Sequence, residues 1–271
     1  MPELPEVETT RRGISPHVEG KVITNITVRN PKLRWPVPDN IKNQIVSEQI
    51  KSVQRRAKYL LLEIASGHLM IHLGMSGSLR IVDKGTPPSK HDHVDIEVEN
   101  KLLRYNDPRR FGAVLWIDNL DDSSHLNHLG PEPLTDDFHA DYLFTSSRKR
   151  QTSIKQHIMD NKVVVGVGNI YANESLFMAG IKPTMKASSL THNQSELLSN
   201  SIKQVLARAI EQGGTTLKDF VGGDGKPGYF QQQLAVYGRA NQPCVNCSST
   251  LIEIKQQGRT SVYCPKCQRG R

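Results

Sequence analysis

The stretch VDIEVE at residues 94–99 alternates apolar and acidic side chains without a break. This period of two is typical of a β-strand with one face in a core and the other in water. Three more stretches of the same half point to strands: VITNITV at 22–28, YLLLEI at 59–64 and LMIHL at 69–73. YLLLEI is nearly all apolar, as expected for a strand covered on both faces. Short strands at this spacing indicate a β-sandwich or barrel rather than a parallel α/β sheet.

One helix is expected before these strands, beginning at Pro5 and ending at Gly13. Proline suits the first helical position, and glycine is common just past a helix end. Leu4, Val7 and Ile14 would then lie roughly along one buried face.

From about Gly130 the pattern becomes helical. THNQ at 191–194 resembles a capping box, which pairs the two ends of a helix's first turn. An apolar stripe follows and ends at Gly213-Gly214; we interpret it as core. Its members are Leu197, Leu198, Val205, Leu206, Ala209 and Ile210.

The chain has 271 residues and a formal charge of +8, from 35 basic and 27 acidic side chains. This length suits two domains with a small appendage. The excess of positive charge points, weakly, to a polyanionic partner. No apolar run approaches the roughly 20 residues that span a bilayer. The acidic start MPELPEVETT lacks a signal pattern, so we expect a cytoplasmic protein with no membrane partner.

The four cysteines, Cys244, Cys247, Cys264 and Cys267, form two C-x-x-C pairs near the C-terminus. Each such pair can direct two thiolates onto one tetrahedral Zn²⁺, and a hairpin can bring the pairs together. Redox dithiols or free thiols are the weaker alternative. We therefore expect one bound Zn²⁺ per chain.

Pro2 is a candidate nucleophile. Removal of Met1 would expose a secondary amine, which can attack a sugar C1′ and form a permanently charged iminium. Glu3 and Glu6 lie beside it in sequence and could move protons. A proline at position 2 is, by itself, usually only a chain start.

Several other segments could contact DNA, but each also has an ordinary structural interpretation. Lys58 follows two arginines and could contact a phosphate or carry a proton, or it could be a solvated strand end. HLGMSG at 72–77 could expose Met75 as a wedge between bases or bury it in a hairpin. DPRRFG at 107–112 combines two cations with an aromatic ring, a nucleic-acid pattern or a salt-bridged turn.

The remaining candidates lie in the second half. VGVGN at 165–169 could open a helix whose N-terminus binds phosphate, with Asn169 as a cap or donor, or could be a tight turn. Arg150 ends a basic run, which is most often a solvated surface. Arg259 lies between the cysteine pairs, where a hairpin tip would project a cation.

Together these segments resemble the bacterial formamidopyrimidine-DNA glycosylase family, bifunctional base-excision enzymes that are also abasic-site lyases. The resemblance covers essentially the whole chain. Its segments are PELPEVET at 2–9, RRAKYLLLE at 55–63, HLGMSGSLR at 72–80, KHDHVD at 90–95, DPRRFG at 107–112, HLGPEPL at 128–134, VVGVGNIYA at 164–172, GGTTLKDF at 213–220 and the four-cysteine finger.

The resemblance implies an α+β multidomain fold with DNA in a cleft between its domains. An N-terminal catalytic β-sandwich domain would span 1–130. A helix-two-turn-helix DNA-binding domain would span 131–234 and include a lesion-covering loop at 213–229. A zinc finger would span 235–271.

The resemblance also implies roles for single residues. Pro2 would be the Schiff-base nucleophile and Glu3 a proton donor at the sugar. Lys58 would act in β-elimination and Arg259 in δ-elimination. The remaining sets are DNA contacts (His72, His91, Arg109, Arg110, Arg150, Asn169), a base-stack wedge (Met75, Arg109, Phe111) and catalytic support (Glu6). The family often has lysine where this chain has Arg150; both are cations, so we expect the phosphate contact to be kept.

The implied activity is removal of oxidised purines, 8-oxoguanine and formamidopyrimidines, from double-stranded DNA, followed by strand nicking, by a monomer. Two rivals stay open. Endonuclease VIII relatives, which prefer oxidised pyrimidines, differ at the PELPEVE start and the long glycine loop. A non-catalytic zinc-containing DNA-binding protein would not need Pro2 with Glu3 and Lys58.

Overall fold

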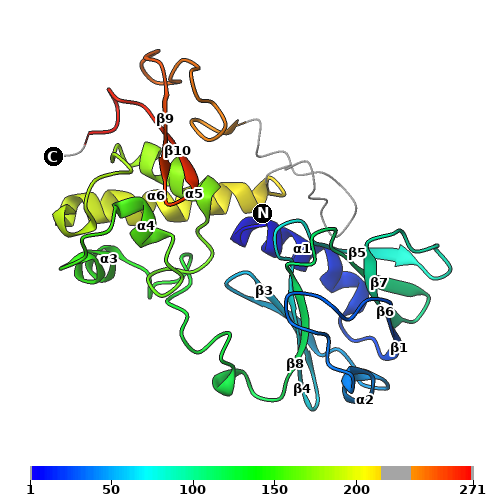
Figure 1. Ribbon diagram of the computed structural model, residues 1–271. Helices are drawn as coiled ribbons and strands as arrows, with labels where there is room; N and C mark the ends of the chain where they lie inside the picture. The colour runs from blue at the N-terminus through cyan, green and yellow to red at the C-terminus, as the bar shows by residue number, and fades with distance from the viewer. Residues whose placement is uncertain (1, 215–232, 270–271) are drawn as a thin grey trace. The chain divides into compact units, whose positions relative to one another are not determined.

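The computed structural model describes residues 2–214 and 233–269 (Figure 1). The chain divides into two compact units. The first unit comprises Met1–Asn127 with Ile210–Gln231, and the second comprises His128–Ala209 with Gln232–Arg271. Within the described part of the chain, no helix is both long enough and apolar enough to cross a membrane.

The first unit is a sandwich of two four-stranded antiparallel sheets. One sheet has the order β1-β6-β7-β5 and the other the order β2-β3-β4-β8. Their bounds are β1 Ile23–Val28, β2 Ser52–Arg56, β3 Tyr59–Ile64, β4 Gly67–His72, β5 Ser78–Asp83, β6 Asp92–Val98, β7 Lys101–Asn106 and β8 Ala113–Ile117. Two short helical segments, α2 Ile41–Ile45 and the 3₁₀ turn η1 Leu120–Asp122, lie in its connections.

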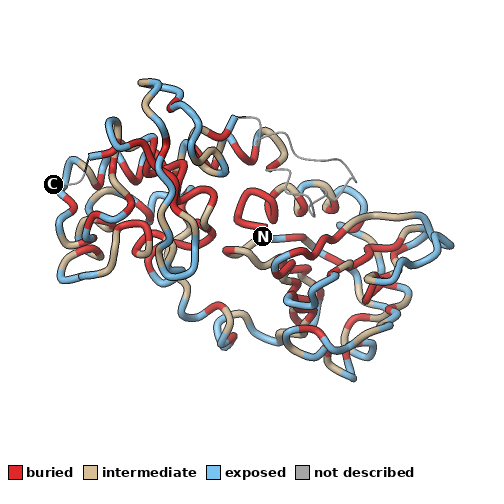
Figure 2. Tube along the Cα trace, turned by 45° about the horizontal axis from the view of Figure 1, so that its top comes forward, coloured by how far each residue is buried: buried red, intermediate tan, exposed pale blue. Residues whose placement is uncertain are grey.

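Apolar side chains from both sheets form one core. Leu60 and Leu62 of β3 and Ile96 of β6 contribute to it and are almost fully buried. Buried segments, drawn in red, recur along the tube of this unit (Figure 2). The sheets therefore pack face to face, which confirms the sandwich expected from the alternating strands.

Helix α1 (Leu4–Val18) packs against this sandwich through the predicted face, with Leu4, Val7 and Ile14 buried. The predicted end at Gly13 is wrong, because the helix continues to Val18. Apolar residues on the same face continue beyond Gly13, and their burial outweighs the roughly 1 kcal/mol by which glycine weakens a helix interior.

The acidic face of β6 is not simply exposed to water. Asp95 is buried, and the fully buried Arg104 of β7 binds it through two hydrogen bonds of 2.8 Å each. Arg104 also donates to the carbonyls of Thr86 and Pro87 at 2.9 and 3.0 Å. Burial acts to raise the pKa of Asp95, but its bonds to Arg104 and Arg29 outweigh this, so the pKa lies below its usual value.

The second unit is mainly helical, with one two-stranded hairpin. Its elements are α3 Ala140–Ser147, α4 Ile154–Ile158, α5 Asn169–Met178, the 3₁₀ turn η2 Ala187–Ser189, α6 His192–Glu211 (whose last residues belong to the first unit), β9 Ile252–Gln256 and β10 Arg259–Tyr263. The capping box before α6 is confirmed, since Gln194 N donates to Thr191 Oγ1 and Thr191 N to Gln194 Oε1. Leu197 is 48% exposed, so its place in the core stripe is wrong.

Removing Arg104 should destabilise the first unit. In Arg104→Met, Asp95 stays buried and loses its bidentate partner; such a loss typically costs about 3–5 kcal/mol, and the ion pair that Asp95 keeps with Arg29 should place the cost towards the lower end of this range. Lys101→Met is the matched control, because the Lys101–Asp83 pair is exposed and solvent screens it, so its loss should change stability little. Urea unfolding of both variants measures the difference; equal losses would contradict a structural role for the buried pair.

Candidate functional site

The N-terminal end of α1 holds two buried carboxylates next to Pro2. Pro2 is buried, and Glu3 and Glu6 are 2% and 0% exposed. Glu3 caps the helix, and its backbone N–H donates to Glu6 Oε2 at 2.8 Å in the reciprocal pairing of a capping box. Gly214, with φ of +79°, lies against Glu6, and a Cβ at this position would come within 3.3 Å of the Glu6 side chain. Glu6 thus fixes the backbone of the residue that follows Pro2.

Lys58 lies in the tight turn between β2 and β3, where Ala57 has a positive φ of 54°. Arg55 supports this turn by donating to the Ala57 carbonyl at 3.0 Å. The same arginine donates to Glu8 of α1 at 3.2 Å. One guanidinium therefore links the helix that follows Pro2 to the turn that carries Lys58.

His72, at the end of β4, is paired in register with Tyr59, the residue after Lys58. Its Nδ1 accepts the Gly74 N–H at 3.0 Å, so the neutral ring carries its proton on Nε2. Burial, together with the charges of Lys58, Arg34 and His125, lowers the pKa of His72 to about 4. At neutral pH, His72 is therefore an uncharged hydrogen-bond donor within a cluster of cations.

The two apolar side chains of the predicted wedge are exposed. Met75 is 41% and Phe111 49% exposed, although both are large and apolar. They line a groove of about 520 Å³ together with His72, Gly74, Arg34 and Arg110. An exposed apolar pair rimmed by cations suits contact with stacked bases beside phosphates.

The loops that carry the wedge approach each other closely. A Cβ on Gly74 would lie 2.5 Å from the backbone of Phe111 and Gly112, and one on Gly112 would lie 1.8 Å from Tyr105 Oη. Only glycine fits either position. Arg109 and Arg110 are exposed on the second loop, and Arg110 has a positive φ of 57°.

His91 lies on a neighbouring loop of the same unit. Its carbonyl accepts the Asp107 N–H at 3.0 Å, and its ring is partly exposed. The bonds from Arg104 to Thr86 and Pro87 hold the start of this loop. The structure thus brings His91 next to the loop of Arg109 and Arg110.

In the second unit, α5 begins at Asn169 after the cap Gly168, which confirms a helix start in the glycine-rich segment. Asn173, one turn later, donates to the Asn169 carbonyl at 2.6 Å and accepts the Val262 N–H of β10 at 2.8 Å. Lys155 of α4 is fully buried and donates to the Thr260 carbonyl at 2.7 Å. Both side chains therefore bind the edge of β10 that β9 does not cover.

Arg259 is the first residue of β10 and is exposed. It follows the hairpin turn of Gln257 and Gly258, which both have positive φ, so the hairpin expected between the cysteine pairs is confirmed. Arg150 is exposed in the turn after α3. The burial of His157 and, second, the positive charge of Arg150 lower the pKa of His157 to about 4.

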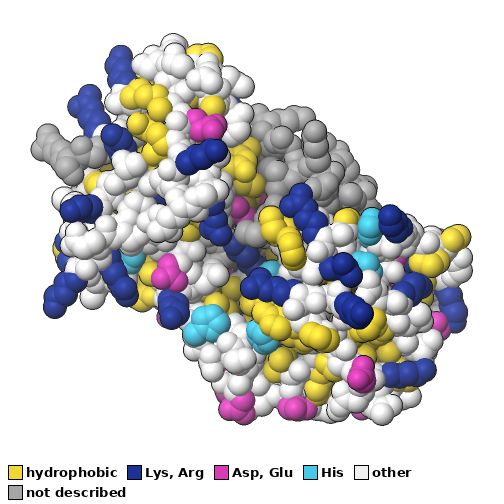
Figure 3. Space-filling model, viewed as in Figure 1, with side chains coloured by type: hydrophobic (Ala, Val, Ile, Leu, Met, Phe, Trp, Pro, Cys, Tyr) yellow, Lys and Arg dark blue, Asp and Glu magenta, His cyan; other side chains and the backbone are white. Residues whose placement is uncertain are grey.

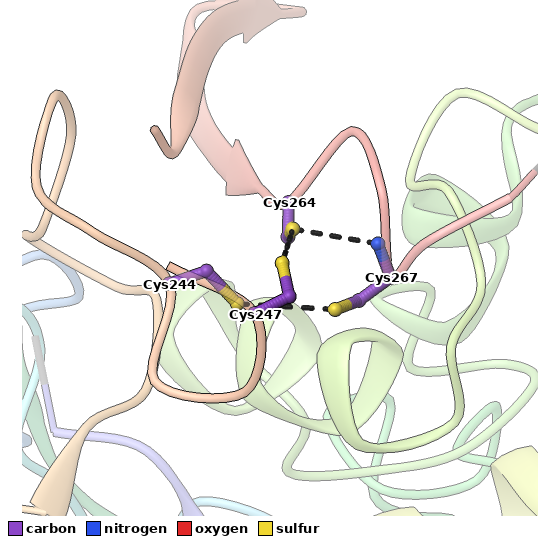
Figure 4. Close-up of side chains that lie close together, drawn as sticks. All are labelled: Cys244, Cys247, Cys264 and Cys267. Carbon is purple, nitrogen blue, oxygen red and sulfur yellow. Dashed lines mark hydrogen bonds between the residues drawn. The ribbon is translucent and has the colours of Figure 1, made fainter. Parts of the chain in front are cut away.

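The four cysteines form a metal centre. Their Sγ atoms all lie within 4.8 Å of one another, with 3.9 Å between Cys244 and Cys267 and 3.4 Å between Cys247 and Cys264 (Figure 4). A tetrahedral Zn²⁺ with Zn–S bonds of about 2.3 Å places its sulfurs about 3.8 Å apart. Four thiolates at this spacing fit Zn²⁺ and fill its coordination sphere, so the site is structural.

The metal centre is anchored to α5 by apolar and polar contacts. Phe177 packs with Leu251, Val262 and the buried cysteines. Glu174 accepts three backbone N–H bonds, from residues 235, 236 and 237, at 2.8–3.0 Å. Burial raises the pKa of Glu174 although these bonds act to lower it. The zinc module is therefore fixed to the helix that begins at Asn169.

Sequence reasoning missed Arg34, Lys155 and Asn173. Arg34 stacks on Trp35 with 4.6 Å from its guanidinium carbon to the ring, and it lines the wedge groove. An exposed arginine beside a tryptophan is a signal that the sequence already carried. Lys155 and Asn173 gave no such signal, because only the folded chain places them against β10. The part of the predicted lesion-covering loop from residue 215 to 229 lies outside the described residues.

Cations are spread over the visible face of each unit (Figure 3). In the first unit, histidine and apolar side chains lie among them on the same face. This mixture matches the composition of the wedge groove.

Three family profiles match the sequence. The formamidopyrimidine-DNA glycosylase N-terminal domain matches residues 1–114 and the formamidopyrimidine-DNA glycosylase H2TH domain residues 129–221. A zinc finger found in FPG and IleRS matches residues 241–270.

Similar proteins match over nearly the full length. A formamidopyrimidine-DNA glycosylase of Saccharophagus degradans is 59% identical over 271 residues, which cover 99% of this chain and 100% of the relative. The Lactococcus lactis Fpg (MutM) structure with N7-benzyl-Fapy-dG DNA has 33% identity and a TM-score of 0.92, covering 99% of this chain and 100% of that one. A MutM complex with carbocyclic 8-oxo-G DNA has 33% identity and a TM-score of 0.91, at the same coverage.

The ring of His72 should stay neutral well below its ordinary titration range. We expect an NMR titration midpoint near pH 4, and Lys58→Met should raise it by removing a neighbouring positive charge. Lys84→Met, after β5 in the other sheet, is the control and should leave the midpoint unchanged. Because the unfolded chain binds this proton more readily, His72 should reduce stability as pH falls from about 6.5 towards 4. A wild-type midpoint near 6.5 would contradict the buried, cation-flanked environment.

Replacing one thiolate should remove the metal. Cys264→Ser should abolish stoichiometric zinc, measured by metal analysis, and with it DNA binding, while the first unit keeps its fold by circular dichroism. Thr250→Ala changes an exposed side chain of the same module and should retain one zinc per chain. If metal analysis finds no zinc in the purified native protein, the metal assignment is refuted.

Proposed function

Because this chain belongs to the formamidopyrimidine-DNA glycosylase family, we propose that it removes 8-oxoguanine and formamidopyrimidines from double-stranded DNA and then cuts the strand at the abasic site. The observation that carries the reaction is the placement of Pro2 directly before the buried carboxylates Glu3 and Glu6. The zinc finger supports DNA binding, and its Zn²⁺ takes no part in the chemistry.

Base removal begins at Pro2 once Met1 is gone. The amine lone pair forms a bond to C1′, and the bond between C1′ and the base breaks, so the base leaves with that electron pair and takes a proton, for which Glu3 is the donor. The nitrogen then loses its own proton, which the Glu3 carboxylate can accept, and the recovered lone pair breaks the C1′–O4′ bond as O4′ takes a proton back from Glu3. The product is an iminium without an N–H, because proline is a secondary amine.

Strand cutting follows from the iminium. Loss of a C2′ proton expels the 3′ phosphate as the C3′–O3′ bond breaks, with Lys58 assisting proton transfer. Loss of a C4′ proton then expels the 5′ phosphate as the C5′–O5′ bond breaks, with Arg259 at the departing oxygen. Water hydrolyses the iminium and returns the Pro2 amine.

The remaining residues bind and shape the DNA. The cations Arg110 and Arg150 are exposed and suit phosphates, and neutral His72 and Asn169 can donate hydrogen bonds. Met75, Arg109 and Phe111 would fill the space left by an everted base. The bound partner is damaged duplex DNA; the similar MutM structures contain DNA with N7-benzyl-Fapy-dG or carbocyclic 8-oxo-G, which supports this.

Domain boundaries, oligomeric state and cellular location belong to the same proposal. The catalytic, helix-two-turn-helix and zinc-finger domains span 1–130, 131–234 and 235–271. The protein works as a monomer. It acts on the nucleoid DNA of a bacterial cytoplasm, which agrees with the bacterial source of the relative above.

The activity test uses duplexes that carry 8-oxoguanine opposite C or thymine glycol opposite A, with a gel for cut strands. Faster cutting of the first substrate is expected. Preference for thymine glycol would indicate the endonuclease VIII type, and tight binding without cutting would indicate a non-catalytic zinc-containing DNA-binding protein.

Borohydride should trap a covalent protein–DNA adduct on Pro2, found by peptide mapping. Pro2→Gly should keep DNA binding and lose most excision. Glu3→Gln should block base removal but leave some cutting of a pre-formed abasic site, where no base has to leave. An adduct on Lys58, with Pro2→Gly fully active, would refute the N-terminal mechanism.

A further inference from the structure

Asp107 is a fully buried carboxylate at the end of β7 to which the mechanism gives no role. Its Oδ1 accepts the Ser76 hydroxyl and the Arg109 N–H, both at 3.2 Å. Its Oδ2 accepts the Gly112 N–H at 2.9 Å and the Tyr105 hydroxyl at 3.2 Å. Four donors therefore converge on one side chain.

Three of these four donors come from the two loops that carry the wedge, and the fourth, Tyr105, belongs to β7. Ser76 follows Met75, while Arg109 and Gly112 flank Phe111 on either side. Met75 and Phe111 are 36 positions apart in the chain, and neither lies in a strand or helix. Asp107 is thus a direct link between the backbones that hold the two exposed apolar side chains.

The backbone of Asp107 is itself fixed. Its N–H donates to the His91 carbonyl at 3.0 Å, and its carbonyl is 2.8 Å from His93 Nε2. The hydroxyl of Tyr105, one of the four donors, also lies 3.1 Å from the His72 carbonyl, so its single proton is shared between this carbonyl and Asp107. The link is therefore anchored to the sandwich rather than shared between two mobile loops.

We propose that Asp107 is a positioning residue for lesion recognition, which sets Met75 and Phe111 at one spacing so that both enter the base stack together. This inference rests on the proposed function. The aspartate side chain suits the position because its two oxygens can both accept hydrogen bonds. An amide of the same shape keeps one acceptor and would leave one loop without its hydrogen bonds.

The test compares two substrates in single-turnover reactions of the full-length, zinc-loaded protein. Asp107→Asn should cut a duplex with 8-oxoguanine opposite C about 10–100 times more slowly, the range expected for misplaced groups. Cutting of a pre-formed abasic site should change by no more than about twofold, because no stacked base has to be probed there.

A double-mutant cycle separates positioning from general destabilisation. In a Met75→Ala/Phe111→Ala background, Asp107→Asn should cause no further loss, since the side chains it positions are gone. Asp83→Asn is the matched control, because it makes the same exchange at an exposed carboxylate at the end of β5, outside the Asp107 hydrogen bonds, and should leave the ratio of the two substrates unchanged. Tyr105→Phe removes one of the four donors. It should also slow cutting of the 8-oxoguanine duplex more than cutting of the abasic site, with a smaller loss than Asp107→Asn. This variant serves as the test if Asp107→Asn does not fold.

Equal losses on both substrates, or losses that multiply in the cycle, would overturn the positioning role. Wild-type rates for Asp107→Asn on both substrates would overturn it as well. Failure of the wild-type protein to cut either substrate would instead refute the proposed function.

Discussion

Buried polar side chains have to find partners inside the protein, because an unpaired buried donor or acceptor costs about 1–3 kcal/mol and an unpaired charge more. In the first unit this constraint governs Arg104 and Asp107. Arg104 binds Asp95 and the loop before His91, and Asp107 binds both wedge loops. The loops that carry candidate DNA contacts are thereby ordered by charges in the core rather than by their own sequences.

The second unit uses the same principle around the zinc module. A two-stranded hairpin is marginally stable alone and exposes two edges. Asn173 and Lys155 satisfy the free edge of β10, and Glu174 binds the backbone that leads into the module. Arg259 and Asn169 therefore belong to one packed group of elements. Hydrogen bonds from the side chains of Asn173, Lys155 and Glu174 to the backbone hold this group together.

Electrostatics follow from this packing. The turn that carries Lys58 lies beside His72, so burial and nearby positive charge keep the ring neutral. A neutral donor next to cations can bind a phosphate oxygen without adding to the local positive charge. The chemistry proposed for Pro2 also depends on a buried polar contact. The Glu6 carboxylate accepts the backbone N–H of Glu3 and so orders the N-terminal end of α1.

The sequence by itself determined the features that depend on neighbours in the chain. Alternation predicted the strands, the cysteine spacing predicted the metal centre, and the motif at 191–194 predicted the cap of α6, because each is a local pattern. Tertiary structure decided what depends on distant partners. It extended α1 past Gly13, exposed Leu197 and buried Asp95 against Arg104. It also gave roles to Arg34, Asn173 and Asp107, since a residue acquires its partners only when segments far apart in the chain pack together.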